Sequence, residues 1–369
     1  MCYNYDMSIN FKSMLYYIEH HKTPFKKSKL NEVDALVFSF ISYFHIDKFI
    51  KKGSFDSILV KDLNDKRYFD KMLFDSIDIK NAKKMVKLLA ESPRFQDVEI
   101  AYYVETIDKK VEKQFSAMTF RYLDKNYFVA YRGTDHSFVG WKEDLNLAYL
   151  TYVPAQRDSL KYLKKVMSKL EGTYYVGGHS KGGNLAVYAG SFVDDKYRSK
   201  IRNIYSFDGP SLNKKLIKES DYSKIKRKIK KYVPQSSVVG MIFEKTSNYN
   251  IVRSNSIGTL QHNPFSWEID GDAFKRVKDS TFDSKIFKKA VNVLIDSLSE
   301  KELKIAVDMI YEVMLSSKAD SVEKFTKHFT TSVMGILESL TRLDDKQKAT
   351  IMKAVNIYAT EVVKSMFVK

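Results

Sequence analysis

The stretch Tyr174-Tyr175-Val176-Gly177-Gly178-His179-Ser180-Lys181-Gly182-Gly183-Asn184 decides the fold of this 369-residue chain. A β-type run enters it, and a helix-compatible run, residues 185–189, leaves it. Residues 178–182 have the G-x-S-x-G form of a nucleophile elbow, in which a sharp strand-to-helix turn raises a serine hydroxyl above a sheet. Side chains at Gly178 or Gly182 would collide where strand and helix approach most closely, and we expect a strained backbone at Ser180. The stretch predicts a nucleophilic serine; the alternative is a glycine-rich turn with an idle serine.

Length and composition allow a large folded core. The hydrophobic fraction is 44% and the aromatic fraction 14%, which argues against global disorder. The single cysteine, Cys2, cannot form an internal disulfide and suits a reducing compartment. The most apolar run, residues 35–44, is about half as long as a membrane span. Residues 1–22 lack the order of a secretory signal, so we expect a cytoplasmic protein.

The chain is strongly basic, with 62 Lys and Arg residues against 45 Asp and Glu residues and a net charge of +17. Such a charge permits attraction to nucleic acid or to an anionic membrane. The densest basic stretch, residues 214–231, has few interleaved aromatic residues, which argues against nucleic acid. A solvated helix face is the simpler interpretation of that stretch. Peripheral docking to anionic lipid head groups at the inner membrane surface is the alternative.

Alternating apolar patterns predict a sheet around the serine. Three β-type runs precede it, and Asp124-Lys125-Asn126 predicts a hairpin turn between the second and third. A helical pattern and the elbow strand follow, and further strands come after the elbow helix. The sequence therefore predicts an α/β fold with a mostly parallel sheet, an antiparallel start and helices on both faces. The predicted strands are residues 98–107, 114–122, 127–131, 201–207, 229–233 and 249–254, and the helix before the elbow is 155–170.

Helical patterns flank this sheet on both sides in the sequence. We expect residues 1–94 to form an N-terminal helical part packed on the core, residues 95–272 to form the core, and residues 273–369 to form a C-terminal helical bundle or cap. In the last part, Ser299 and Glu302 have the spacing of a capping box. Two more helical patterns cover residues 322–340 and 344–367. A partner-binding module is the alternative for this tail.

A serine nucleophile needs a general base within hydrogen-bond reach. In the elbow fold this base is a histidine that follows the serine in the chain. His262 and His328 follow Ser180, and His328 belongs to a helical pattern in the tail. His262 lies on a loop beside a proline and a tryptophan, so we predict it as the base; the alternative is a surface histidine. His179 is interpreted as structural, because neighbouring side chains on a tight turn diverge.

The remaining catalytic groups are predicted from their places along the strands. Asp208 ends the strand after the elbow, where we expect the acid that orients the base; an ordinary turn aspartate is the alternative. The backbone N–H groups of Lys181 and Thr134 are the predicted oxyanion donors, and the Thr134 hydroxyl could add another bond. Arg132 and Asp135 are expected to brace the Thr134 loop.

These residues resemble a known family. Tyr131-Arg132-Gly133-Thr134-Asp135, Trp141, Asp144 and residues 178–183 are similar to the class 3 (fungal-type) lipases, a group of α/β-hydrolases. With Asp208-Gly209-Pro210 and Gln261-His262 added, the set most resembles the bacterial lipase-like branch of Mbeg1-like proteins, over about residues 95–272. The resemblance implies an α/β-hydrolase fold and a Ser-acid-His hydrolase acting on lipid or acyl esters. The apolar segment 145–153 could cover the site as a lid.

The sequence departs from the class 3 pattern at the acid. Class 3 lipases carry it in a later Asp-x-Val segment, and the matching residues 235–239 contain no carboxylate. Two alternatives remain: a relocated acid at Asp208, or a weak or inactive hydrolase-fold protein that interacts through its basic face and helical tail. No metal-ligand spacing and no dinucleotide or Walker pattern is present, so we expect a serine esterase without a cofactor.

Overall fold

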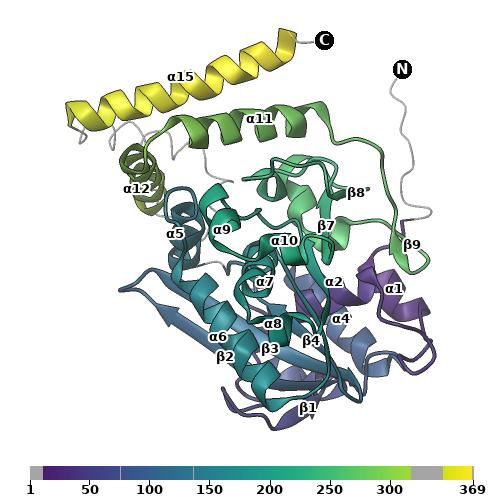
Figure 1. The fold of residues 1–369 in the computed structure, drawn as a ribbon. Coiled ribbons are helices and arrows are strands. Elements are labelled where there is room, and N and C mark those ends of the chain that lie inside the picture. Colours follow the sequence, from purple (N-terminus) through teal and green to yellow (C-terminus); the bar gives the residue numbers. More distant parts are fainter. Residues whose placement is uncertain (1–10, 75, 136, 317–343, 368–369) are drawn as a thin grey trace, which may run out of the picture.

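A single large sheet forms the centre of the molecule (Figure 1). The structure is a computed structural model that describes residues 11–74, 76–135, 137–316 and 344–367. Its strands lie side by side in chain order, antiparallel from β1 to β4 and parallel from β4 to β8. The predicted mostly parallel sheet with an antiparallel start is therefore confirmed. The strands are β1 (Ser57–Leu59), β2 (Glu99–Asp108), β3 (Lys113–Leu123), β4 (Asn126–Tyr131), β5 (Thr173–His179), β6 (Ile201–Phe207), β7 (Ile229–Pro234) and β8 (Asn250–Val252).

Helices cover both faces of this sheet, as predicted. On one face lie α1 (Met14–His20), α2 (Glu32–Ile41) and α4 (Ile79–Glu91), and on the other lie α6 (Pro154–Lys169) and α7 (Lys181–Phe192). Shorter helices connect the elements: α3 (Phe69–Leu73), α5 (Phe138–Asn146), α8 (Asp195–Arg198), α9 (Lys214–Glu219) and α10 (Tyr222–Ile225). A small separate hairpin joins β9 (Ile269–Asp270) and β10 (Ala273–Phe274).

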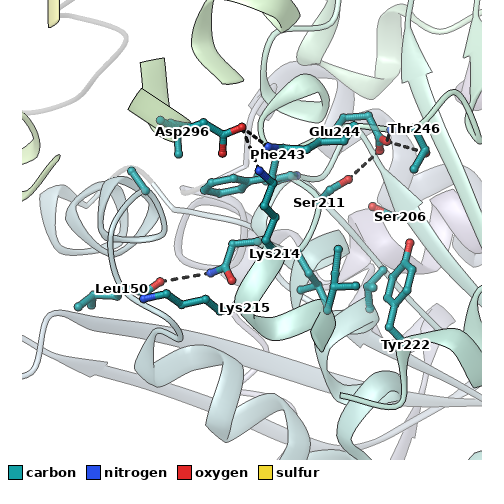
Figure 2. A pocket seen from close by; sticks show the side chains of 18 of the residues that line it. Leu150, Ser206, Ser211, Lys214, Lys215, Tyr222, Phe243, Glu244, Thr246 and Asp296 are labelled. Carbon is teal, nitrogen blue, oxygen red and sulfur yellow. Dashed lines mark hydrogen bonds and ion pairs between the residues drawn. The ribbon is translucent and has the colours of Figure 1, made fainter. Parts of the chain in front are cut away.

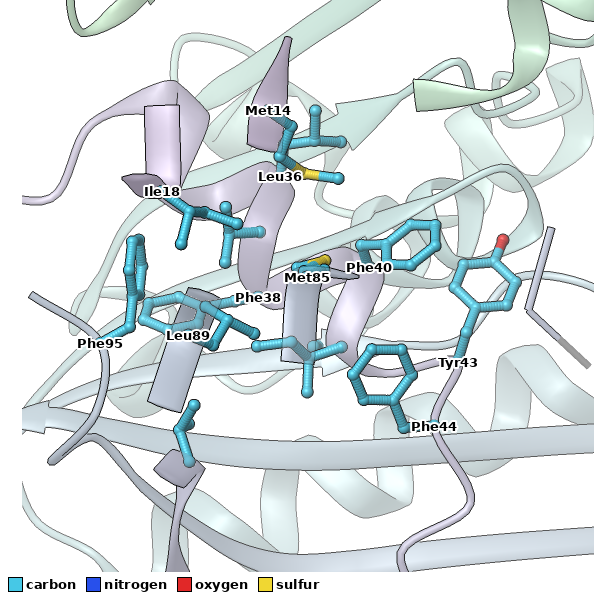
Figure 3. Packing of buried hydrophobic residues seen from close by; sticks show 14 of the residues in the cluster. Met14, Ile18, Leu36, Phe38, Phe40, Tyr43, Phe44, Met85, Leu89 and Phe95 are labelled. Atoms are coloured by element: carbon cyan, nitrogen blue, oxygen red, sulfur yellow. The ribbon is translucent and has the colours of Figure 1, made fainter. Parts of the chain in front are cut away.

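Helix α2 is the centre of one core (Figure 3). Its N-cap Asn31 accepts hydrogen bonds from two backbone N–H groups, and Asp34 completes a capping box. Its residues are buried almost all round, so this helix lies inside the protein rather than on its surface. Phe38 of α2 stacks on Phe120 of β3 with ring centroids 4.6 Å apart. The N-terminal helices thereby share one core with the sheet.

A buried ion pair also fixes the N-terminal helices to the core. Arg94 contacts Asp34 through two nitrogens, at 2.7 and 2.5 Å, and both side chains are fully buried. Arg94 also donates to the carbonyls of Thr23 and Lys29. A buried pair is tolerated only when its remaining polar atoms are satisfied, and removing one partner typically costs about 3–5 kcal/mol. This pair therefore holds α2 in one position against the sheet.

Three helices of the described C-terminal residues lie beside the carboxyl ends of the parallel strands, with α15 alongside α11 (Figure 1). They are α11 (Phe282–Ser297), α12 (Glu300–Ser316) and α15 (Asp345–Phe367). Helix α12 contacts α5 through an ion pair between Asp308 and Lys142. The predicted capping box is present, since the backbone N–H of Ser299 donates to Glu302 and that of Glu302 donates to the Ser299 hydroxyl.

Part of the predicted helical tail lies outside the described residues. The helical pattern at residues 322–340, which contains His328, lies outside the described residues. The pattern at 344–367 corresponds to α15. None of the helices that the structure describes is long and apolar enough to cross a membrane.

Candidate active site

The glycine-rich stretch forms a strand-to-helix turn with Ser180 at its apex. Strand β5 ends at His179 and α7 begins at Lys181. Ser180 has φ +56° and ψ −130°, a conformation that costs energy for any residue with a Cβ atom. Its backbone N–H donates to the Phe207 carbonyl at 2.9 Å, which fastens the turn to β6. The strained serine conformation expected from the sequence is present.

Two glycines make this turn sterically possible. A Cβ atom at Gly178 would lie 2.4 Å from the carbonyl carbon of Gly182. A Cβ atom at Gly182 would lie 2.1 Å from the Tyr131 carbonyl oxygen, at the end of β4. Both distances are far inside van der Waals contact with backbone atoms that cannot move aside. Helix α7 therefore approaches β4 and β5 this closely only with glycine at both positions.

His262 and Asp208 lie in direct contact. The Nδ1 atom of His262 is 2.6 Å from Oδ2 of Asp208. Asp208 directly follows β6 and is 1% exposed, while 27% of the His262 side chain is open to solvent. A carboxylate can only accept a hydrogen bond, so Nδ1 carries a proton, and in the neutral imidazole the lone pair is then on Nε2. This is the tautomer that a general base requires.

The second carboxylate oxygen of Asp208 is held by the segment in which a class 3 lipase would carry its acid. The Ser237 hydroxyl and, at 3.2 Å, the Gly240 backbone N–H donate to Oδ1 of Asp208. Residues 235–239 therefore contribute the Ser237 hydroxyl as a donor instead of a carboxylate, and the next residue, Gly240, adds its backbone N–H. The structure places the carboxylate that contacts His262 on the loop after β6.

The loop that carries His262 is fixed by hydrogen bonds on both sides. His262 ends a short 3-10 helix, η4 (Gly258–His262). The fully buried Trp267 donates from Nε1 to the Gln261 carbonyl at 2.8 Å, and the Gln261 side chain accepts from the Ser236 backbone at 2.8 Å. The neighbouring tryptophan thus orients the loop.

His179 supports His262 from the opposite side. Its Nε2 lies 2.8 Å from the His262 carbonyl oxygen, its Nδ1 lies 2.9 Å from the Tyr43 hydroxyl, and the two imidazole centroids are 4.5 Å apart. The carbonyl only accepts, so Nε2 carries the proton and Nδ1 accepts from Tyr43. Burial, with the nearby His262 as a lesser cause, holds the pKa of His179 well below its ordinary value. His179 is therefore a neutral side chain that connects the elbow to the His262 loop.

Tyr43 extends this connection to the Thr134 loop. A Cβ atom at Gly133 would lie 2.1 Å from the Tyr43 hydroxyl oxygen, and the Gly133 backbone hydrogen-bonds to that hydroxyl. One tyrosine in the turn after α2 therefore contacts both the predicted oxyanion loop and His179. The sequence offered no signal for this contact, because Tyr43 and His179 are 136 residues apart.

The Thr134 loop follows β4 and is braced by charged side chains. The Thr134 hydroxyl donates to Asp144 of α5, so it is already engaged and does not supply the additional oxyanion bond that the sequence suggested. Arg132 is 1% exposed and donates to the Ser42 carbonyl at 2.8 Å, and Asp135 accepts from the Ser137 backbone at 2.9 Å. Arg132 and Asp135 therefore brace the loop.

The Lys181 side chain has a structural role that the sequence did not reveal. Its Nζ is buried 3.0 Å from Glu143 and 2.6 Å from the Gln114 side-chain oxygen. Burial lowers the Lys181 pKa, but Glu143 and Asp144 outweigh it and the net pKa is raised. Burial also disfavours the charged form of Asp144 and raises the pKa of this carboxyl to about 6, while the nearby Lys181 acts in the opposite direction. A quarter of the Asp144 side chain remains exposed. The Lys181 side chain thus connects the start of α7 to Glu143 of α5.

The mostly parallel sheet with helices on both faces and the serine elbow define an α/β-hydrolase fold. The Mbeg1-like family model matches residues 89–312, so the chain belongs to the Mbeg1-like family. This match extends past residue 272 through α11 and most of α12, further than the resemblance in the sequence suggested. No curated protein matches the chain.

Solved lipase structures are similar to the chain at low identity. M37 lipase has 16% identity and a TM-score of 0.34, over 56% of this chain and 67% of the lipase. The Rhizomucor miehei lipase in its propeptide complex has 16% identity and a TM-score of 0.34, over 52% of this chain and 66% of the lipase. A mutant of MDLA from Penicillium cyclopium has 14% identity and a TM-score of 0.36, over 66% of this chain and 83% of that protein. The chain thus spans about two thirds of the first two lipases.

Proposed function

We propose that this protein is a serine hydrolase that cleaves carboxylic esters through an acyl-enzyme on Ser180. One observation carries the proposal: the imidazole of His262 is held by the buried carboxylate of Asp208, and its ring centroid lies 4.5 Å from that of His179, which directly precedes the strained Ser180 at the strand-to-helix turn. Such a constellation activates a serine wherever it occurs, whatever the order of its members in the chain.

In the proposed mechanism, the Ser180 hydroxyl attacks the ester carbonyl while His262 Nε2 accepts its proton. Asp208 stabilises the resulting imidazolium. The oxyanion accepts hydrogen bonds from the backbone N–H groups of Thr134 and Lys181; the latter is the first residue of α7, whose N–H has no partner within the helix. His262 then gives the proton to the leaving alcohol. A water then attacks the acyl carbonyl while His262 accepts its proton, and His262 returns that proton to Ser180 Oγ as the bond between Oγ and the acyl carbon breaks and the acid leaves.

The proposed substrate is a lipid or another acyl ester. The family resemblance and the apolar segment 145–153 support this choice. Within that segment Leu147 and Val153 are buried against Phe243, so the segment has an apolar contact surface on the core. We propose that it covers the substrate as a lid.

Ester cleavage tests the proposal. We expect hydrolysis of p-nitrophenyl acetate, butyrate, octanoate or laurate by the wild type, and its loss in Ser180→Ala. Ser168→Ala, at an exposed serine of α6, is the matched control and should keep full activity. Activity in Ser180→Ala would overturn the assignment. A folded wild type inactive on all four esters would favour a non-catalytic interaction protein that uses the basic face and helical tail.

A further inference from the structure

A cavity of about 260 Å³ lies between the loop after β6, helix α9, residues 243–246 and helix α11 (Figure 2). Asp296 and Phe243 border it on one side, and Ser206 and Tyr222 on the other. Among the residues that the structure describes, neither Ser180 nor His262 lines it. The cavity therefore does not include the proposed nucleophile or base, although Ala148, Tyr149 and Leu150 of its lining belong to the segment proposed as a lid.

The interior of this cavity is mainly apolar. Side chains from the core, from α11 and from the segment after α5 contribute to it: Leu150, Val187, Leu212, Phe243, Ile295 and Leu298. Concave apolar sites with a few polar groups at defined places are the usual form of small-molecule sites. The interior suits a hydrocarbon chain.

The buried charged pair in the lining, Lys231 and Glu244, is internally satisfied. Lys231 Nζ lies 2.8 Å from Glu244, 2.7 Å from the Gly240 carbonyl and 2.8 Å from the Ser211 hydroxyl. Both charged side chains are about 5% exposed. All three hydrogens of the ammonium group are used, so this pair offers a ligand no free charge.

The mouth of the cavity, in contrast, has an excess of positive charge. Five lysines but only three carboxylates line the cavity as a whole. Lys214 and Lys245 both contact the same oxygen of Asp296, so two ammonium groups share one carboxylate. These two lysines are 63% and 36% exposed. Lys215 pairs with Glu300, and Lys226 adds a further cation to the lining. The mouth can therefore accept another anionic group without losing Asp296.

We propose that this cavity binds a single-chain anionic amphiphile, with its hydrocarbon chain in the apolar interior and its head group on Lys214 and Lys245. A fatty-acid carboxylate and a lysophospholipid phosphate share this chemistry, because both join one chain to an anionic head. The site goes beyond the proposed ester hydrolysis and does not depend on Ser180.

Calorimetric titration of the full-length Ser180→Ala variant tests the site without interference from hydrolysis. The probes are decanoate, decanol and decanoyl lysophosphatidate, each below its micelle concentration. We expect decanoate to bind at one molecule per chain and decanol to bind at least about tenfold more weakly, since tenfold corresponds to about 1.4 kcal/mol. The comparison of decanoate with lysophosphatidate distinguishes a fatty-acid carboxylate from a lysophospholipid phosphate as the natural head group. The anionic probe that binds more tightly identifies the head group, and tighter binding of either probe supports the site.

Variants locate the binding in the cavity. Lys214→Met combined with Lys245→Met should weaken decanoate by about tenfold and leave decanol unchanged. Lys218→Met, on the same helix but away from the cavity, is the matched control. Ile295→Trp should fill the cavity and abolish binding, with Val355→Trp on α15 as its control. Equal affinity for decanol and decanoate, no effect of Ile295→Trp in a folded protein, or no binding of either anionic ligand would each overturn the proposal.

Discussion

His262 Nδ1 lies 2.6 Å from Asp208 Oδ2, although the two residues are 54 positions apart and belong to different loops of the sheet edge. The contact fixes both the tautomer and the position of the imidazole. Residues 235–239, where a class 3 lipase carries its acid, have no carboxylate. In this chain Asp208 contacts the histidine instead, and Ser237 and Gly240 donate hydrogen bonds to Asp208.

The acid assignment is tested by Asp208→Asn. The amide cannot stabilise an imidazolium and favours the wrong tautomer, so we expect ester cleavage to fall by about 10⁴-fold with the fold retained. Asp279→Asn, at an exposed aspartate, is the control and should be fully active. Steady-state kinetics and circular dichroism check both. Activity within tenfold of wild type in Asp208→Asn would show that another group orients His262.

The buried Lys181–Glu143 pair should matter for stability more than for chemistry. Lys181→Met leaves the Glu143 carboxylate buried without its cation, which we expect to lower the free energy of unfolding by about 3–5 kcal/mol. The proposed oxyanion donor is the backbone N–H, which this substitution retains. Adding Glu143→Gln removes the unpaired charge and should recover part of the loss. Urea unfolding measures both; a loss below about 1 kcal/mol in Lys181→Met would contradict the buried pair.

Tyr43 should affect the active site from the N-terminal helices. Tyr43→Phe removes the donor to His179 Nδ1 and the acceptor of Gly133, so we expect a stability loss of about 1–3 kcal/mol. We also expect slower turnover, because two loops of the proposed site lose a shared contact. Tyr16→Phe, on α1 and 38% exposed, is the control. Turnover and stability equal to wild type in Tyr43→Phe would refute the connection.

His179 should give the protein a distinctive loss of stability in acid. Its pKa is depressed in the folded state, whereas the unfolded chain takes up the proton near its ordinary value of 6.5. The unfolded state therefore binds more protons below about pH 6.5, and stability falls as pH decreases, by up to about 1.4 kcal/mol per pH unit. Above that pH the contribution is fully present.

His179→Gln removes this titration and keeps a donor that can reach the His262 carbonyl. Urea unfolding from about pH 7.5 to about pH 5.5 should show a flatter pH dependence in His179→Gln than in wild type. His20→Gln, at an exposed histidine of α1, should leave the slope unchanged. Parallel slopes for His179→Gln and wild type would mean that His179 takes up a proton in the folded protein.

The fold could be predicted largely from local sequence. The glycines within residues 177–183 indicate a tight strand-to-helix turn, because a side chain there would collide with the backbone. The alternating apolar patterns on either side predicted the sheet with its antiparallel start. Asp208 could be placed because side chains at the carboxyl ends of neighbouring parallel strands meet at one edge. Its identification as the acid remains a prediction until activity is measured.

The supporting contacts could not be predicted, because they join distant segments through buried polar groups. Nothing in the sequence near Tyr43 indicates a partner at His179. For Lys181 the sequence predicted a role only for the backbone N–H, not for the side chain. Lys231 belongs to a basic stretch interpreted as a solvated face, yet it is buried against Glu244. Periodicity shows which face of a strand or helix is buried, but it does not show which polar groups are paired there.

The most direct test of the central claim is labelling with a fluorophosphonate probe, followed by mass mapping of the modified peptide. The account predicts one adduct, on Ser180, lost in Ser180→Ala and in His262→Ala and retained in His20→Ala. An adduct on another residue, or no adduct on a folded wild-type protein, would contradict an activated serine at this elbow.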